Sequence, residues 1–142
     1  MDSDLEEVLE QYHRAVAAVL KGDSSPQERL FSRSDDVTLA NPLGPPARGW
    51  TEVSSALHRA VSQLSDGEVL ESERISGYAS GDLAYILEIE RSRVKVGGAR
   101  EAALSSLRVT TIFRREKDGW KILHRHADTI TSPRPIESVI DE

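Results

Sequence analysis

The sequence predicts an α+β fold, in which N-terminal helices pack against one curved antiparallel sheet that forms a cone around them. Two clear helical patterns precede residue 67, and four β-prone stretches separated by turn signals follow it. The chain has 142 residues, 38% of them hydrophobic, which is the size and composition of one domain with its own core. We therefore expect residues 1–142 to fold as a single domain.

The first helix is predicted over residues 4–21, where apolar side chains recur at three- and four-residue steps. Ser3 and Glu6 have the spacing of a capping box, which would satisfy exposed amides at the helix start. Gly22 can adopt the left-handed conformation that commonly ends a helix.

Three further elements are predicted before the sheet. Ser25 and Pro26 mark the start of a short second helix, because proline is favoured at the first helical position. Residues 37–40 are β-prone, and the prolines and glycines of residues 42–49 then predict a stiff loop. Apolar residues at helical spacing across 53–64 predict a third helix that ends near residues 65–67.

Four long strands are expected to form an antiparallel meander. Glycine-containing turns separate them. The strands are predicted at residues 68–79, 82–96, 102–116 and 120–129.

The faces of the last two strands follow from the turn between them. If Asp118 and Gly119 form a two-residue turn, one face is the more apolar and should be the concave side. A bulge or a longer turn would swap these faces and bring Arg108 inward. The concave face is predicted to hold Val109, Thr111, Phe113, Ile122, His124 and His126, and the opposite face Ile112, Leu123 and Arg125.

Polar residues on that apolar face predict a ligand pocket, because pockets combine an apolar lining with a few convergent polar groups. These residues are His124, His126 and Thr111, with Asp128 next in line. The structural alternative is that each histidine bonds a neighbouring hydroxyl or carbonyl group inside the core.

Charge and composition argue against several classes of partner. The 24 acidic residues exceed the 18 lysines and arginines, and the cations are dispersed, so nucleic acid is not an expected partner. No apolar run approaches the ~20 residues of a membrane span, so we expect no membrane partner. The absence of cysteine and of a secretory pattern at the start favours the cytoplasm.

Two stretches carry a resemblance to a known superfamily. Residues 36–44, followed by Arg48 and Gly49 before a helix, resemble the ketosteroid isomerase-like proteins of the nuclear transport factor 2 superfamily. Residues 108–126 look like the final hairpin of that superfamily, and are also similar to SnoaL-like cyclases and to the association domain of calcium/calmodulin-dependent protein kinase II. The resemblance implies a cystatin-like cone over nearly the whole chain, and a homodimer.

The residues that carry acid–base chemistry in ketosteroid isomerases are not kept here. Asn41 occupies the position of their proton-shuttling aspartate, and an asparagine cannot act as that base. Their phenol donor would fall near Ala15, and their second acid near Thr111. The resemblance therefore does not imply isomerisation by the usual constellation.

The first functional hypothesis is a domain that binds a small, apolar carbonyl compound, with proton transfer, cyclisation or hydration as its reaction if it is an enzyme. His124 or His126 is the candidate base, and Asn41 could polarise the carbonyl group. We expect no cofactor. The candidate ligand-binding residues are Tyr12, Trp50, Thr111 and Asp128.

Two alternatives stay open. The domain could be a non-catalytic oligomerisation or ligand-sensing unit that pairs through the outer sheet face, where Ile112 and Leu123 lie among cationic residues. His124, His126 and Asp128 also have the spacing of three metal ligands on one strand, although this motif is short and we assign no metal.

Overall fold

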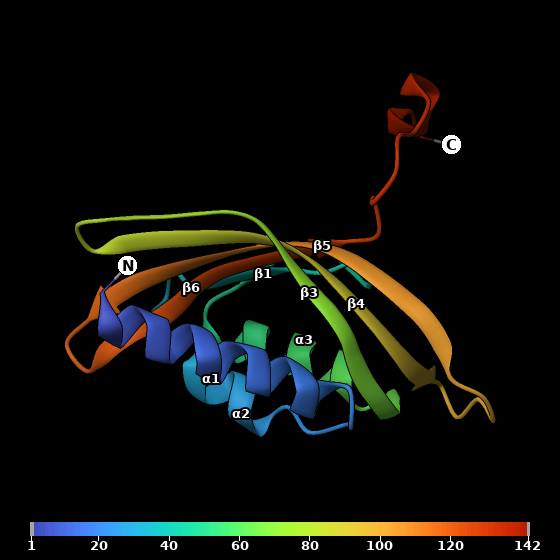
Figure 1. The fold of residues 1–142 in the computed structure, drawn as a ribbon, viewed down its shortest axis with the longest axis horizontal. Coiled ribbons are helices and arrows are strands. Elements are labelled where there is room, and N and C mark those ends of the chain that lie inside the picture. The colour runs from blue at the N-terminus through green and yellow to red at the C-terminus, as the bar shows by residue number, and fades with distance from the viewer. Residues whose placement is uncertain (1, 142) are drawn as a thin grey trace.

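The structure is a computed structural model and describes residues 2–141. Three α-helices precede a long β-meander, as the sequence predicts (Figure 1). The helices are α1 (Ser3–Val19), α2 (Ser25–Leu30) and α3 (Trp50–Val61), followed near the C-terminus by the 3-10 helix η1 (Ile136–Val139). The strands are β1 (Thr38–Ala40), β2 (Ala47–Arg48), β3 (Leu64–Ser80), β4 (Leu83–Val96), β5 (Ala103–Glu116) and β6 (Gly119–Asp128).

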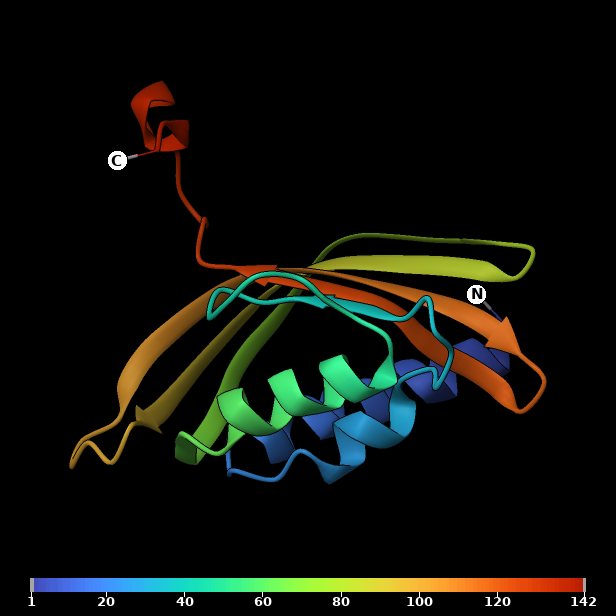
Figure 2. The same ribbon diagram turned by 180° about the vertical axis from the view of Figure 1, so that it is seen from behind.

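One six-stranded sheet curves over the three helices, in the order β2-β1-β6-β5-β4-β3. Neighbouring strands are antiparallel except for β1 and β6, which run parallel. All three α-helices lie on the concave side of the sheet, and no helix covers its convex side in either view of residues 2–141 (Figures 1 and 2). This arrangement is the predicted cone, and the cavity described below lies between its two layers.

The core lies where α1 meets the sheet. The apolar stripe of α1 is buried, including Leu5, Leu9 and Val16, because its three- and four-residue spacing puts these side chains on one face. They pack in one cluster with Phe113 of β5 and Ile122 of β6. Of the helices in residues 2–141, none has the length and apolar composition that crossing a membrane requires.

The start of α1 differs in detail from the prediction. Asp2, and not Ser3, is the N-cap residue, and its carboxylate accepts a hydrogen bond of 2.7 Å from the backbone N–H of Leu5. A carboxylate near the positive end of the helix dipole is favourable for the same reason as a capping hydroxyl. Gly22 has a φ of +87°, which agrees with the expected left-handed residue after the helix.

The third helix ends earlier than predicted, and the sheet begins earlier. Helix α3 ends at Val61, and β3 already starts at Leu64. Gly67 lies inside this strand, where its N–H donates to the carbonyl oxygen of Leu20 over 2.9 Å. A Cβ atom at Gly67 would lie 2.6 Å from that oxygen, so the glycine permits close contact between β3 and the end of α1.

A β-bulge in β6 changes which side chains face the helices. Phe113 pairs with Ile122 and Ile112 pairs with His124, so Leu123 is the additional residue. Because strand side chains alternate, one extra residue inverts the facing of everything after it. Arg125 is therefore buried on the concave side, opposite Thr111.

The predicted face of His124, His126 and Asp128 is therefore wrong. The prediction assumed unbroken alternation after Ile122, and the bulge places these three residues on the convex side. The predicted face of Thr111 is confirmed, since this residue is fully buried on the concave side of β5. Arg108 remains on the convex side and exposed.

Candidate functional site

A cavity of about 280 Å³ lies between the concave side of the sheet and the helices. Most of its lining is apolar, and a few polar side chains converge on it, which is the usual composition of a small-molecule site. The polar residues include Glu90 and Arg125 on the sheet, Gln27 on α2 and Asn41 in the loop after β1. Apolar lining residues include Val16, Leu39, Leu57, Val94, Leu107 and Ala127.

Four buried polar residues form what we call the inner cluster: Tyr12 of α1, Glu90 of β4, Thr111 of β5 and Arg125 of β6. Nη2 of Arg125 donates to Oε1 of Glu90 over 2.8 Å, and the Tyr12 hydroxyl donates to Oε2 of the same carboxylate over 2.8 Å. Arg125 Nε and Thr111 Oγ1 donate to the Tyr12 oxygen over 3.1 Å and 3.2 Å. Four elements of the fold thus meet in one hydrogen-bonded group.

The hydrogen-bonding capacity of Tyr12 is used within this cluster. Burial raises the pKa of its phenol, although the nearby Arg125 charge works in the opposite direction. The phenol is therefore protonated at neutral pH, with its one proton directed at Glu90 and both lone pairs accepting. Tyr12 thus positions Glu90 and Arg125, and its hydroxyl is not free to donate to a ligand.

Glu90 and Arg125 line the cavity and keep bonding capacity for a ligand. Among the hydrogen bonds within residues 2–141, none uses Nη1 of Arg125. A carboxylate accepts about four hydrogen bonds, and Glu90 accepts two from the inner cluster. The site therefore offers a cationic donor beside an anionic acceptor, both held by the inner cluster and both largely buried.

A second buried carboxylate lies two residues before Glu90 on the same strand. Glu88 accepts from Arg74 Nε over 2.8 Å and lies 2.8 Å from His13 Nε2. Burial would raise the pKa of Glu88, but its bonds to His13 and Arg74 outweigh that effect and lower it. The bond to Glu88 in turn raises the pKa of the His13 imidazole. This group ties α1 to β3 and β4.

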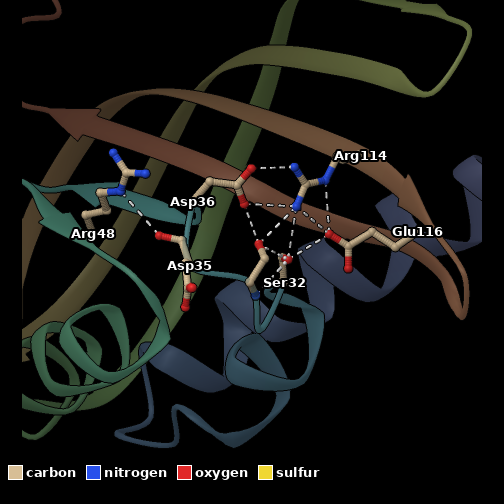
Figure 3. A network of polar contacts seen from close by, with 7 residues as sticks. Ser32, Asp35, Asp36, Arg48, Arg114 and Glu116 are labelled. Atoms are coloured by element: carbon tan, nitrogen blue, oxygen red, sulfur yellow. Dashed lines mark hydrogen bonds and ion pairs between the residues drawn. The ribbon is translucent and has the colours of Figure 1, made fainter.

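A third polar group, the outer cluster, consists of Ser32, Ser34, Asp36, Arg114 and Glu116. Figure 3 labels all of its members except Ser34. The Arg114 guanidinium donates to Asp36 Oδ2 over 2.7 Å, to Ser34 Oγ over 2.9 Å and to Glu116 Oε2 over 2.9 Å. The bond to Arg114 holds the pKa of Asp36 well below its usual range. The outer cluster fastens residues 32–36 to β5, and none of its members lines the cavity.

The two candidate catalytic histidines lie on the convex side of the sheet, where they bond to their neighbours. His124 Nδ1 lies 2.7 Å from the Thr38 hydroxyl, and partial burial lowers its pKa, assisted by the charge of His126. His126 is exposed, with Nε2 3.2 Å from Asp128 Oδ2. Asp128 also accepts two bonds from Arg108, of 3.0 Å and 2.8 Å. The fold brings these residues together, but away from the cavity.

The remaining candidates are divided between the cavity and other regions. Asn41 lines the cavity, and its Oδ1 accepts from the Leu43 N–H over 3.0 Å. Tyr12 and Thr111 belong to the inner cluster, as shown above. Trp50 opens α3 outside the cavity, with the Arg33 guanidinium stacked 3.7 Å from its ring centroid. No three acidic or histidine side chains of residues 2–141 are arranged to hold a metal ion.

Glu90 and Arg125 are not found by reasoning from the sequence alone. The sequence carries one weak signal for Arg125, because apolar Trp120 and Ile122 occupy even positions while apolar Leu123 and Ala127 occupy odd ones. Such a change of phase is what a β-bulge between residues 122 and 127 would produce. The sequence does not indicate that Glu90 faces the helices. Leu87 and Ile89 lie on the opposite face of β4 and make that face look like the more apolar one.

Comparisons with solved structures agree with this architecture. A nuclear transport factor 2-like superfamily protein from Salmonella enterica superposes with a TM-score of 0.79 at 18% identity, covering 93% of this chain and 94% of that one. A ketosteroid isomerase-like protein from Erwinia carotovora atroseptica gives a TM-score of 0.69 at 16% identity, with coverages of 94% and 100%. At these identities the likeness concerns the fold.

A third solved structure has a similar fold. A protein from Thiobacillus denitrificans, provisionally assigned as a calcium/calmodulin-dependent protein kinase type II association domain, gives a TM-score of 0.65 at 20% identity. The match covers 89% of this chain and 94% of that one. No significantly similar sequence was found among proteins of curated function. The family model of the SnoaL-like domain matches residues 5–131, nearly the whole length of the chain, which therefore belongs to the SnoaL-like domain family.

Proposed function

We propose that this domain binds a small, neutral, largely apolar carbonyl compound in the cavity, with the carbonyl oxygen accepting a hydrogen bond from Nη1 of Arg125. The observation that carries the proposal is the Glu90–Arg125 pair at the wall of a cavity whose lining is otherwise mostly apolar. The volume of about 280 Å³ is at the small end for ligand sites, which favours a compact ligand. Asn41, at the same cavity, is a second possible donor to the carbonyl group.

The inner cluster favours a neutral ligand over a charged one. Glu90 and Arg125 neutralise each other at 2.8 Å, and Tyr12 is uncharged. The other charged lining residue, Arg91, is already paired with Glu71 and Glu73. A carboxylate or an ammonium ion entering the cavity would lose its hydration without gaining an unpaired countercharge.

The same pair suits proton transfer next to a carbonyl group, and we assign the role of base to Glu90 rather than to the histidines. In this step the α-C–H bond of the ligand breaks, the proton passes to a Glu90 oxygen, and the electron pair moves to the carbonyl oxygen. Arg125 Nη1 would stabilise the resulting enolate, since a donor fixed in a dry site needs little reorganisation. Return of the proton to carbon completes the exchange.

Binding is tested by calorimetric titration with 2-tetralone, a neutral bicyclic ketone. Leu107 lines the cavity, so Leu107→Trp should fill part of it and reduce affinity at least tenfold. The matched control is Leu123→Trp on the convex side, which should leave affinity unchanged. Equal affinities in all three proteins, or no binding by the wild type at millimolar ketone, would overturn the proposal.

Proton transfer is tested separately, by the rate of deuterium incorporation into the α-positions of 2-tetralone in D₂O. The wild type should accelerate this exchange over buffer, and Glu90→Gln, which keeps the shape of the side chain, should abolish the acceleration. Replacement of His126 by Gln should have no effect, because this side chain lies on the convex side. An acceleration that survives Glu90→Gln but not His126→Gln would reverse the assignment.

We also propose that the domain forms a homodimer through the convex side of the sheet. In the part of the chain that the structure describes, no helix covers that side (Figure 1). Partly exposed apolar residues lie among the charged ones there, including Tyr85, Ile112 and Leu123. The likeness to a provisional association domain supports the same reading. Sedimentation velocity should find a dimer in the wild type, a monomer in Ile112→Lys, and a dimer in the loop control Leu43→Lys. A wild-type protein that stays monomeric even when its concentration is raised 100-fold would refute the proposed dimer.

A further inference from the structure

Gln27 is a buried polar side chain that the inner cluster does not use. It lies on α2, is 3% exposed and lines the cavity from the helix layer, whereas Arg125 lines it from the sheet. None of the hydrogen bonds found within residues 2–141 involves its carboxamide. In residues 2–141 the only fully buried side-chain polar atom without a partner is Nε1 of Trp120, so the polar atoms of Gln27 keep some accessible surface, and the cavity is the space that this residue lines. Polar groups in protein interiors normally have a hydrogen-bond partner.

The position of this carboxamide indicates that the partner comes from within the cavity. The cavity that Gln27 lines is also lined by apolar side chains, including those of Val16 and Leu57, which cannot hydrogen-bond to it. A carboxamide both donates and accepts, so a hydroxyl group, which also does both, matches it fully. Gln27 in the helix layer and Arg125 in the sheet thus line the same cavity from its two sides.

We propose that the ligand is a neutral hydroxyketone, with its carbonyl oxygen at Arg125 and its hydroxyl group at the Gln27 carboxamide. This inference rests on the function proposed above and adds the chemical class of the ligand and a residue that determines specificity. A site built to bond a hydroxyl group rejects the analogue that lacks it, because the protein group is then left unpaired. Gln27 therefore selects the hydroxylated compound over the plain ketone.

The test compares 2-tetralone with its 5-, 6- and 7-hydroxy derivatives by calorimetric titration. The wild type should bind at least one hydroxy derivative about threefold to tenfold more tightly than 2-tetralone, which is the range expected for one net hydrogen bond. Gln27→Met has similar volume without polar atoms, so it should remove this preference and retain affinity for 2-tetralone. Circular dichroism checks that the variant is folded.

The matched control is Gln63→Met. Gln63 also lines the cavity, but it is exposed and its amide donates to the Arg59 carbonyl oxygen over 3.1 Å, so this variant should keep the preference. Equal binding of all four ketones by the wild type, or a preference that survives Gln27→Met, would overturn this inference alone. Failure of every ketone to bind would instead overturn the proposed function on which it rests.

Discussion

Two arginine–carboxylate clusters in this domain have similar partners and opposite surroundings. In the inner cluster Arg125 is buried with Glu90 and Tyr12, and it faces the cavity. In the outer cluster Arg114 is partly exposed and bonds Asp36, two serines and Glu116 (Figure 3). Solvent screens the outer cluster, so it can fasten a loop but has little influence on chemistry. Burying the charges of the inner cluster costs free energy, but the hydrogen-bonding groups that the cluster leaves unused can bind a ligand in the cavity.

The largest expected effect is the loss of one charge from the inner cluster. Arg125→Met leaves the Glu90 carboxylate buried without its cation, and should lower the free energy of unfolding by about 3–5 kcal/mol. Denaturant unfolding at neutral pH measures this change. The double variant Arg125→Met/Glu90→Leu should recover much of the loss, because no unpaired charge then remains. A loss below about 1 kcal/mol in the single variant would mean that water reaches Glu90 freely.

Removing only the Tyr12 hydroxyl should have a smaller effect. Tyr12→Phe removes one hydrogen-bond donor to Glu90. It also removes the oxygen that accepts from Arg125 Nε and from the Thr111 hydroxyl group. We expect a loss of about 1–3 kcal/mol in the free energy of unfolding. Tyr78→Phe is the control, because that ring is largely exposed and should change stability very little. Identical losses in both variants would contradict a positioning role for Tyr12.

Breaking the outer cluster should have a smaller effect again. Arg114→Met removes the ion pairs to Asp36 and Glu116 in a partly solvated setting, and should lower the free energy of unfolding by about 1 kcal/mol. The effect should shrink as salt rises from 0.05 M to 1 M, since screening weakens exposed ion pairs. A loss equal to that of Arg125→Met, or one insensitive to salt, would remove the distinction between the two clusters.

The pair between partly exposed His13 and buried Glu88 provides the smallest expected effect, and this effect depends on pH. The folded-state pKa of His13 is raised, so its contribution is fully present below its unfolded value of about 6.5 and is lost as pH rises through the folded pKa. His13→Gln should therefore cost more stability at pH 6 than at pH 8.5. Urea unfolding at the two pH values measures the difference, with exposed His58→Gln as a control. A loss of stability in His13→Gln that is larger at pH 8.5 than at pH 6 would contradict a raised pKa for His13 in the folded state.

The fold was largely predictable because its signals are periodic and redundant. The apolar stripe of α1 and the turns of the meander each repeat a pattern over many residues. An error at one residue therefore changes only the predicted end of a helix or strand. Gly67 illustrates the limit, since glycine suits both a helix end and the close contact between β3 and Leu20 that the structure contains. The two-residue strand β2 is too short to carry a pattern of its own.

The site was less predictable, because one residue of register decides which side chains enter the cavity. The bulge at Leu123 exchanges His124 for Arg125 opposite Thr111, with no change in secondary structure. Glu90 follows from pairing between β4 and β5, which the six-residue connection between them does not specify in the sequence. The burial of Tyr12 on the α1 stripe and of Thr111 on the concave face was predicted correctly, but neither residue lines the cavity, so their predicted ligand contacts stay a prediction.

The most direct test of the cavity as the binding site is a methyl NMR titration of the wild-type domain with 2-tetralone. The account predicts saturable shift changes at cavity methyl groups such as those of Val16, Leu57 and Leu107, and none at Leu87 and Leu123 on the convex side. Changes confined to the convex side, or an absence of change at the cavity methyl groups with millimolar ketone, would contradict it.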